Sequence, residues 1–172
     1  LVRSTNLPRE LWVLRVVGTE TVEFIFAIPV LALFMAIFWG DIDLDPLMLL
    51  FFPVAMALTI VLTTGLGFFI ASVTVLFPDV SKIVRVILQV GFYLSPVLYG
   101  LHDVDARLSD TGQWLYSLNP MVGIIDLARA GIFPDEFSGW GAPAMSLVIS
   151  VLLLILGTRI FRRLENDVLK EI

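Results

Sequence analysis

The chain has 172 residues and a formal net charge of −5, and 58% of its residues are hydrophobic while only 16% are charged. Soluble domains usually carry about 25% charged residues, so the composition excludes an ordinary soluble domain, and the acidic balance does not suggest nucleic-acid binding. Cysteine is absent and His102 is the single histidine, which excludes disulfides, thiolate metal sites and histidine metal clusters. We therefore predict an all-α integral membrane protein with one transmembrane domain over residues 1–172.

The first twenty residues, LVRSTNLPRELWVLRVVGTE, are predicted to contain an amphipathic helix. Pro8 can occupy the first helical position, and Leu7, Leu11 and Leu14 follow helical spacing. Two interpretations stay open: the helix rests on lipid headgroups, or it docks into another cytoplasmic protein. The chain does not begin with methionine and has no signal-peptide pattern, so we expect N-terminal sequence to be missing.

Four apolar runs approach or exceed the length of about 20 residues that crosses a bilayer. They are residues 22–39, 47–77, 83–100 and 142–161. Pro29 predicts a kink in the first run. The second run would extend about 46 Å as one helix, so it must tilt, project from the membrane or bend. Gly65 and Gly67 are the natural place for bending or for close contact with another helix.

Basic residues predict the orientation of these spans. Nine of the eleven fall on one side: Arg3, Arg9, Arg15, Lys82, Arg85, Arg159, Arg162, Arg163 and Lys170. The other side holds Arg107, Arg129 and the acidic loop GDIDLDP. By the positive-inside rule, both chain ends, including the tail at residues 162–172, face the cytoplasm, and the connection at residues 101–141 faces outward.

The predicted cytoplasmic turn FPDVSKIVRV joins the second and third spans. Pro78 ends the preceding helix, and Asp79 can cap the following one. Lys82 and Arg85 are three residues apart and share a helix face. They are either ordinary orientation determinants or contacts for anionic lipid headgroups or a charged substrate.

The outer connection contains LNPMVGIIDLARAGIF, residues 118–133, which is apolar but too short to span a membrane. We predict a helix over residues 120–130 that extends about 16 Å, with Asn119 as its N-cap, Pro120 at its first position and Gly131 as its C-cap. Asp126 and Arg129 are three apart and can neutralise each other.

A second short helix is predicted just before this one, through TGQWLYSL, with Ser109 or Asp110 as its cap. Two short helices with a break between them can dip into the outer leaflet and return, provided that protein or water satisfies the irregular backbone. The alternative is a pair of helices lying flat at the interface.

Several aromatic side chains lie near the predicted outer boundaries. They are Trp39, Tyr93, Tyr99, Trp114, Tyr116 and Trp140. They form either an interfacial belt or, in part, a path in which aromatic faces stack against sugar rings. Tyr93 is the best path candidate because it lies deeper than Tyr99, and we add Phe92, Phe68 and Phe69.

No G-x-x-x-x-G-K-[ST] phosphate loop occurs in the sequence, so we predict that the chain does not hydrolyse ATP and holds no cofactor or metal. Glu23 is the one acidic residue within the predicted spans and lies close to an interface. The sequence therefore does not indicate a proton relay of the kind found in proton-coupled transporters.

The motifs NLPRELWVL, FPDVSKIVRVILQVGFYLSPVLYG, LYSLNPMVGIIDLARAGIF and FRRLENDVLKEI, in this order, resemble the permease subunit of type-2 ABC exporters. The resemblance covers essentially the whole chain and is strongest to the polysaccharide branch, which includes O-antigen, teichoic-acid and galactan permeases. It implies a subunit of six spans, of which this chain would hold the third to the sixth. It also implies a second permease copy and a separate cytoplasmic ATPase that binds ATP and Mg.

The resemblance also implies roles for individual residues. The coupling segment at residues 1–20, which contacts the ATPase, would centre on Pro8, Arg9, Glu10 and Leu11. The outer gate helices would carry Trp114, Tyr116, Asn119, Pro120, Asp126 and Arg129. One departure from the family is Pro78, where many relatives have an arginine.

The expected function is export of a lipid-linked polysaccharide across a prokaryotic cytoplasmic (inner) membrane. The expected partners are the ATPase, a second permease copy, the glycan substrate and membrane lipids. One alternative keeps the exporter but changes the cargo to a drug, a lipid or a small lipooligosaccharide. A second alternative is a membrane scaffold that transports nothing.

Overall fold

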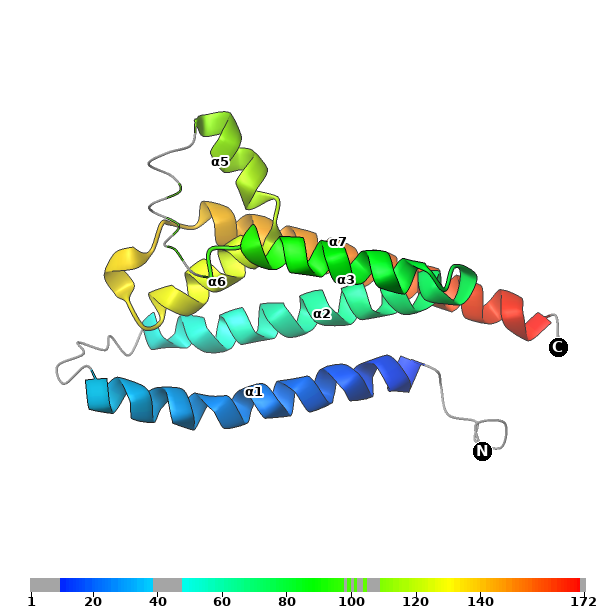
Figure 1. Cartoon of the computed structure of the whole chain (residues 1–172), viewed down its shortest axis with the longest axis horizontal. Coiled ribbons are helices and arrows are strands. Elements are labelled where there is room, and N and C mark those ends of the chain that lie inside the picture. The colour runs from blue at the N-terminus through cyan, green and yellow to red at the C-terminus, as the bar shows by residue number, and fades with distance from the viewer. Residues whose placement is uncertain are drawn as a thin grey trace. The chain divides into compact units, whose positions relative to one another are not determined.

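The computed structural model describes residues 10–38, 48–97, 99, 101, 104 and 109–170. These residues form helices and turns without a strand, so the all-α prediction is confirmed. The elements are α1 (Glu10–Phe38), η2 (Met48–Leu50), α2 (Phe51–Leu76), α3 (Val80–Tyr93), α5 (Asp110–Ser117), α6 (Pro120–Ala130), η3 (Pro134–Glu136) and α7 (Gly141–Lys170) (Figure 1). The chain divides into two units, Leu1–Asp43 and Leu44–Ile172, which we describe separately.

The first unit contains one long helix, α1. It runs for 29 residues and continues through Pro29, so the described part of the predicted coupling segment and the first span form one helix. The hydroxyls of Thr19 and Thr21 donate to the carbonyls of Arg15 and Val17 at 3.0 and 2.7 Å. These bonds satisfy the polar side chains inside the helix.

Three helices are long and apolar enough to cross a membrane: Glu10–Ile37, Phe51–Leu76 and Gly141–Leu164. Of the four predicted spans, the one over residues 83–100 is not among these three helices. In the described part of that run, the helix α3 ends at Tyr93, and its 14 residues extend about 21 Å. Pro96 explains the early end, because proline has no N–H and its ring clashes with the carbonyl four residues earlier in a helix.

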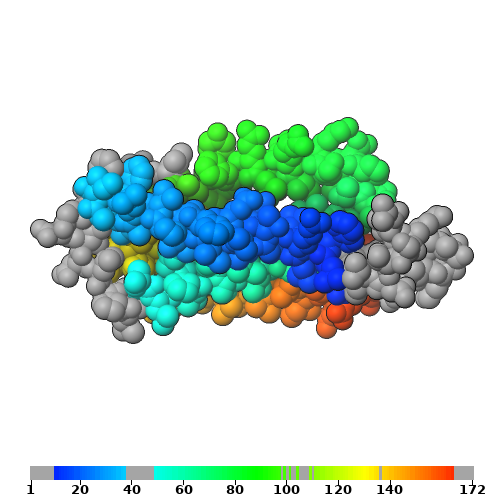
Figure 2. Space-filling model, turned by 90° about the horizontal axis from the view of Figure 1, so that it is seen from below, coloured from blue at the N-terminus to red at the C-terminus, as the bar shows by residue number. Residues whose placement is uncertain are grey.

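The second unit is organised around a close approach of α2 and α7, which lie side by side (Figures 1 and 2). A Cβ atom at Gly65 would lie 2.6 Å from the backbone nitrogen of Leu154, and one at Gly157 would meet the carbonyl oxygen of Gly65. The two glycines therefore allow backbone-to-backbone packing, which larger side chains would prevent. This confirms the predicted close helix contact at Gly65.

The short helix α6 packs against both α2 and α7 (Figure 1). Gly123 of α6 sits against the backbone of Ala142 and Pro143, at the start of α7. The buried core cluster joins α2 to α6 and comprises Ala55, Leu58, Leu62, Ile124 and Leu127. Helix α5 makes few contacts with this core and projects away from it in Figure 1.

Hydroxyl groups within α2 are satisfied by their own helix. Thr59, Thr64 and Ser72 donate to the carbonyls four residues earlier at 2.9, 2.6 and 2.8 Å. An apolar surrounding offers no water to polar side chains, so these internal bonds allow a hydroxyl-rich helix to remain buried or lipid-facing.

We predict that Gly65→Ala destabilises the second unit by about 1 to 3 kcal/mol, the usual cost of overpacking. The added methyl group would collide with rigid backbone of α7 rather than with a flexible side chain. The measurement is the free energy of unfolding in detergent micelles. Gly91→Ala is the matched control, because a Cβ atom at Gly91 would meet nothing within 4 Å, and it should leave stability unchanged or slightly raised.

Candidate functional site

The predicted second gate helix forms with the expected bounds. The side chain of Asn119 accepts a hydrogen bond from the backbone N–H of Met121 at 3.1 Å, and Pro120 occupies the first helical position. Gly131 is the C-cap and has φ −66°, so its capping role does not use the left-handed conformation that favours glycine. The sequence pattern thus predicted both ends of α6 correctly.

The other predicted gate helix also forms, as α5. Ser109 is its N-cap in an extended conformation, and the carbonyl of Ser109 accepts from the N–H of Gln113 at 2.9 Å. Its Trp114 is 58% exposed, whereas Tyr116 is partly buried. Helix α5 therefore presents part of its aromatic surface away from the core.

A set of polar contacts fastens the segment after α3 to α5 and α6; we call it the α3–α6 clasp. The amide nitrogen Nδ2 of Asn119 donates to Ser95 Oγ at 3.0 Å and lies 3.5 Å from the Leu94 carbonyl oxygen. Arg129 donates through Nη1 to the Tyr99 carbonyl at 2.9 Å and through Nη2 to the Val97 carbonyl at 3.1 Å. The hydroxyls of Tyr99 and Tyr116 lie 3.0 Å apart.

The clasp changes the interpretation of Arg129. Asp126 is only 3% exposed and Arg129 is partly buried, and the mutual neutralisation of the two side chains stays a prediction. The guanidinium also donates to two backbone carbonyls, a role that the sequence did not predict. The dipeptide Ser95-Pro96 could have indicated this role. Irregular backbone next to a proline leaves carbonyl groups that need hydrogen-bond donors from elsewhere in the chain.

The four predicted path aromatics have different surroundings. Phe68 is 4% exposed, and its ring centroid lies 5.2 Å from that of Phe161 on α7. Phe69, Phe92 and Tyr93 are 41%, 50% and 65% exposed, and the rings of Phe92 and Tyr93 meet edge to face at 5.6 Å. The burial of Phe68 favours a packing role, whereas the other three side chains have surface available for a ligand.

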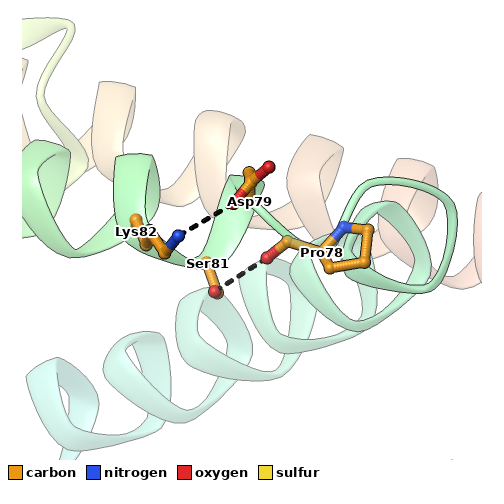
Figure 3. Close-up of polar contacts among 4 residues, drawn as sticks. All are labelled: Pro78, Asp79, Ser81 and Lys82. Atoms are coloured by element: carbon orange, nitrogen blue, oxygen red, sulfur yellow. Dashed lines mark hydrogen bonds and ion pairs between the residues drawn. The ribbon is translucent and has the colours of Figure 1, made fainter.

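The turn between α2 and α3 is held by two short contacts (Figure 3). Lys82 Nζ lies 2.9 Å from Asp79 Oδ1, and the Ser81 hydroxyl donates to the Pro78 carbonyl at 2.9 Å. Asp79 is the N-cap residue but has helical φ and ψ, so its carboxylate makes no capping bond. The ion pair contributes little stability, since Lys82 and Asp79 are 82% and 88% exposed.

Helix α3 has no buried residue. Lys82, Arg85 and Gln89 lie on one exposed face, and the space-filling view shows α3 in green along one edge of the second unit (Figure 2). A polar line of this kind on an otherwise apolar helix needs water, headgroups or another polar partner. The predicted contact with anionic headgroups or a charged substrate remains a prediction.

Only part of the predicted coupling set lies within the described residues. Glu10 begins α1, where a carboxylate interacts favourably with the helix N-terminus, and Leu11 is 44% exposed. Pro8 and Arg9 lie outside the described residues. Among the residues that the structure describes, no group of three or more acidic, histidine or cysteine side chains could hold a metal ion.

Comparison with known proteins decides the family. Residues 1–133 match the ABC-2 type transporter family. The chain belongs to this family. It is 27% identical over 173 residues to the O-antigen export system permease protein RfbA of Myxococcus xanthus, covering 100% of this chain and 64% of that protein. The match confirms the resemblance drawn from the ordered motifs.

Two further relatives come from other bacteria. The polysialic acid transport protein KpsM of Escherichia coli is 25% identical over 114 residues, 66% of this chain and 42% of that protein. The capsule polysaccharide export inner-membrane protein CtrC of Neisseria meningitidis is 29% identical over 130 residues, 76% of this chain and 46% of that protein. The chain thus spans 42% to 64% of the length of these three relatives.

The contrast between Phe68 and Phe69 can be tested directly. We predict that Phe68→Ala lowers the free energy of unfolding in micelles, because it removes the ring packed on Phe161. Truncation of a buried aromatic side chain to alanine typically costs about 3 to 5 kcal/mol in soluble proteins. The loss here should be smaller, since the detergent around the unfolded helices is as apolar as the core. Phe69→Ala is the neighbouring control and should have little effect; an equal loss in both variants would contradict the packing assignment.

Proposed function

We propose that this chain is part of the permease subunit of an ATP-driven exporter that carries lipid-linked polysaccharide across the cytoplasmic membrane. The main support is the match of residues 1–133 to the ABC-2 type transporter family, together with the alignment of the whole chain to an O-antigen export permease. Two further relatives are named for transport of polysialic acid and export of capsule polysaccharide. The relatives therefore agree on the chemical class of the cargo.

The architecture is compatible with such a path. Helix α6 is about half the length of a membrane span, and its buried face is packed into the core formed with α2 and α7. A short helix of this kind can close the outer end of a path without crossing the bilayer. Phe69, Phe92 and Tyr93 offer exposed aromatic faces, on which the C–H faces of sugar rings can stack without fixing one sugar identity.

The energy source is proposed to lie on another subunit. Because the sequence has no phosphate loop, a cytoplasmic ATPase would bind ATP and Mg and act on the coupling segment at residues 1–20. Two permease copies would form the path between them, with both ends of this chain in the cytoplasm, as the distribution of basic residues favours. The surrounding inner-membrane lipids would deliver the lipid-linked glycan.

Depletion of the protein tests the cargo. Accumulation of lipid-linked glycan on the cytoplasmic side of the membrane is the expected result, and its loss at the cell surface should accompany it. Drug sensitivity with normal surface glycan would instead support the alternative cargo. Normal transport of glycan, drugs and lipids, with no nucleotide dependence, would support the scaffold.

The coupling segment generates a separate prediction. In the full-length protein, the double variant Arg9→Ala, Glu10→Ala should weaken co-purification with the ATPase or reduce stimulated ATPase activity on the order of tenfold, as expected for the loss of about one charge-assisted hydrogen bond. The matched control is Arg15→Ala, Glu20→Ala, which removes the same charges farther along α1. Unchanged binding and activity in the first variant would exclude the coupling assignment.

A further inference from the structure

The two ends of α3 are attached to the second unit in different ways. At its start, α3 follows α2 through the turn at Pro78 and Asp79, and the N–H of Val80 donates to the Phe77 carbonyl at 3.0 Å. Along its length, α3 has no buried side chain. Directly after its end, Ser95 is 3% exposed and Pro96 is fully buried. Helix α3 is therefore held at its two ends and has no fully buried residue between them.

The attachment at the end of α3 depends on two side chains of the gate helix region. Residues 94–97 do not form a regular helix, so carbonyl groups in and after this segment need donors from outside it. Arg129 donates to the carbonyls of Val97 and Tyr99. The Asn119 amide donates to the Ser95 hydroxyl oxygen and lies within 3.5 Å of the Leu94 carbonyl. A planar guanidinium fork can serve two separate carbonyls at once, which a lysine ammonium does less well.

The other side of the clasp is rigid. Asn119 and Arg129 lie at opposite ends of α6, and α6 is packed on α2 and α7 through Gly123 and the buried residues Ile124 and Leu127. Val122 and Ala130 have no exposed surface at all. The clasp thus connects the end of a largely exposed helix to the well-packed core that α6 forms with α2 and α7.

The clasp lies next to the exposed aromatic pair. Phe92 and Tyr93 are the last residues before the clasped segment, and the Tyr93 carbonyl accepts from the Tyr99 hydroxyl at 3.3 Å. We propose that Arg129 and Asn119 are positioning residues, which hold the end of α3 on α6 and thereby fix Phe92 and Tyr93 at the predicted glycan path. The inference deepens the proposed function and depends on it only for the identity of the ligand.

The first test measures the position of α3 without any transport assay. This chain has no cysteine, so nitroxide labels are placed by Val90→Cys on α3 and Leu147→Cys on α7, two positions that are 52% and 48% exposed. Any cysteine elsewhere in the full-length protein is replaced by serine. Distances are measured by pulsed electron paramagnetic resonance on the full-length protein in nanodiscs. We expect a narrow distribution in the parent and a broadened, shifted one in Arg129→Lys, Asn119→Ser.

These substitutions are chosen to preserve folding. Lysine keeps the positive charge but loses the fork, and serine keeps an N-cap acceptor for α6 but does not retain the amide donor of the clasp. The control Ser117→Ala removes a hydroxyl that donates to the Trp114 carbonyl within α5 at 2.7 Å, and it should leave the distribution narrow. A second label pair, Val75→Cys on α2 with Ile155→Cys on α7, should remain unchanged and report an intact core.

A covalent replacement provides the converse test. In the Arg129→Lys background, Ser95→Cys and Asn119→Cys are joined by a short bis-methanethiosulfonate, which forms one disulfide with each cysteine and releases two methanesulfinates. The link should restore the restricted position of α3, now followed by a fluorine-labelled phenylalanine at residue 92. Reduction should release it again. A narrow distance distribution between the nitroxides in Arg129→Lys, Asn119→Ser would overturn the proposal. A residue 92 that stays equally mobile after cross-linking would overturn it as well.

The transport assay separates this inference from the proposed function. In the complete exporter, Arg129→Lys, Asn119→Ser should lower glycan export about tenfold, equivalent to about 1.4 kcal/mol, with normal ATPase binding. Normal export despite a displaced α3 would overturn the link between the clasp and the path. If the parent protein exports no glycan, the proposed function fails, while the spin-label result still decides whether the clasp positions α3.

Discussion

The close approach of α2 and α7 at Gly65 and Gly157 is the constraint on which the second unit depends. Within an apolar medium, helices gain little from burying apolar surface against each other, so close packing must hold them together. The two glycines remove the side chains that would separate the helices. Helix α6 then completes the core, because Gly123 repeats the same close approach at the start of α7.

Once this core exists, the remaining polar groups determine how the other segments attach to it. The backbone after α3 is irregular, and its carbonyls obtain donors from Arg129 and Asn119. The residue that looked like half of an ion pair with Asp126 therefore also acts as a hydrogen-bonding anchor. In an apolar surrounding this role is as important as charge balance, because an unsatisfied carbonyl group is costly there.

The sequence patterns were most reliable where the signal was local. Asn119-Pro120 at the start and Gly131 at the end predicted α6 with its observed bounds, since capping depends on neighbouring residues. The helix of the third predicted span ends earlier than the sequence suggested, because proline is tolerated in membrane helices and was not taken as an end signal. No local pattern distinguishes Pro29, which lies inside α1, from Pro96, which follows the end of α3. Phe68 and Phe69 are adjacent and chemically identical, so sequence could not tell which one packs on Phe161.

The sequence by itself determined the all-α class, three of the apolar spans, the capped half-length helix and the family, because these follow from composition, spacing and motif order. Tertiary structure alone decided the partners: Gly157 for Gly65, Phe161 for Phe68, and the Val97 and Tyr99 carbonyls for Arg129. Each of these contacts joins residues at least 30 positions apart. Such pairs are fixed by the packing of whole helices, which no local pattern encodes.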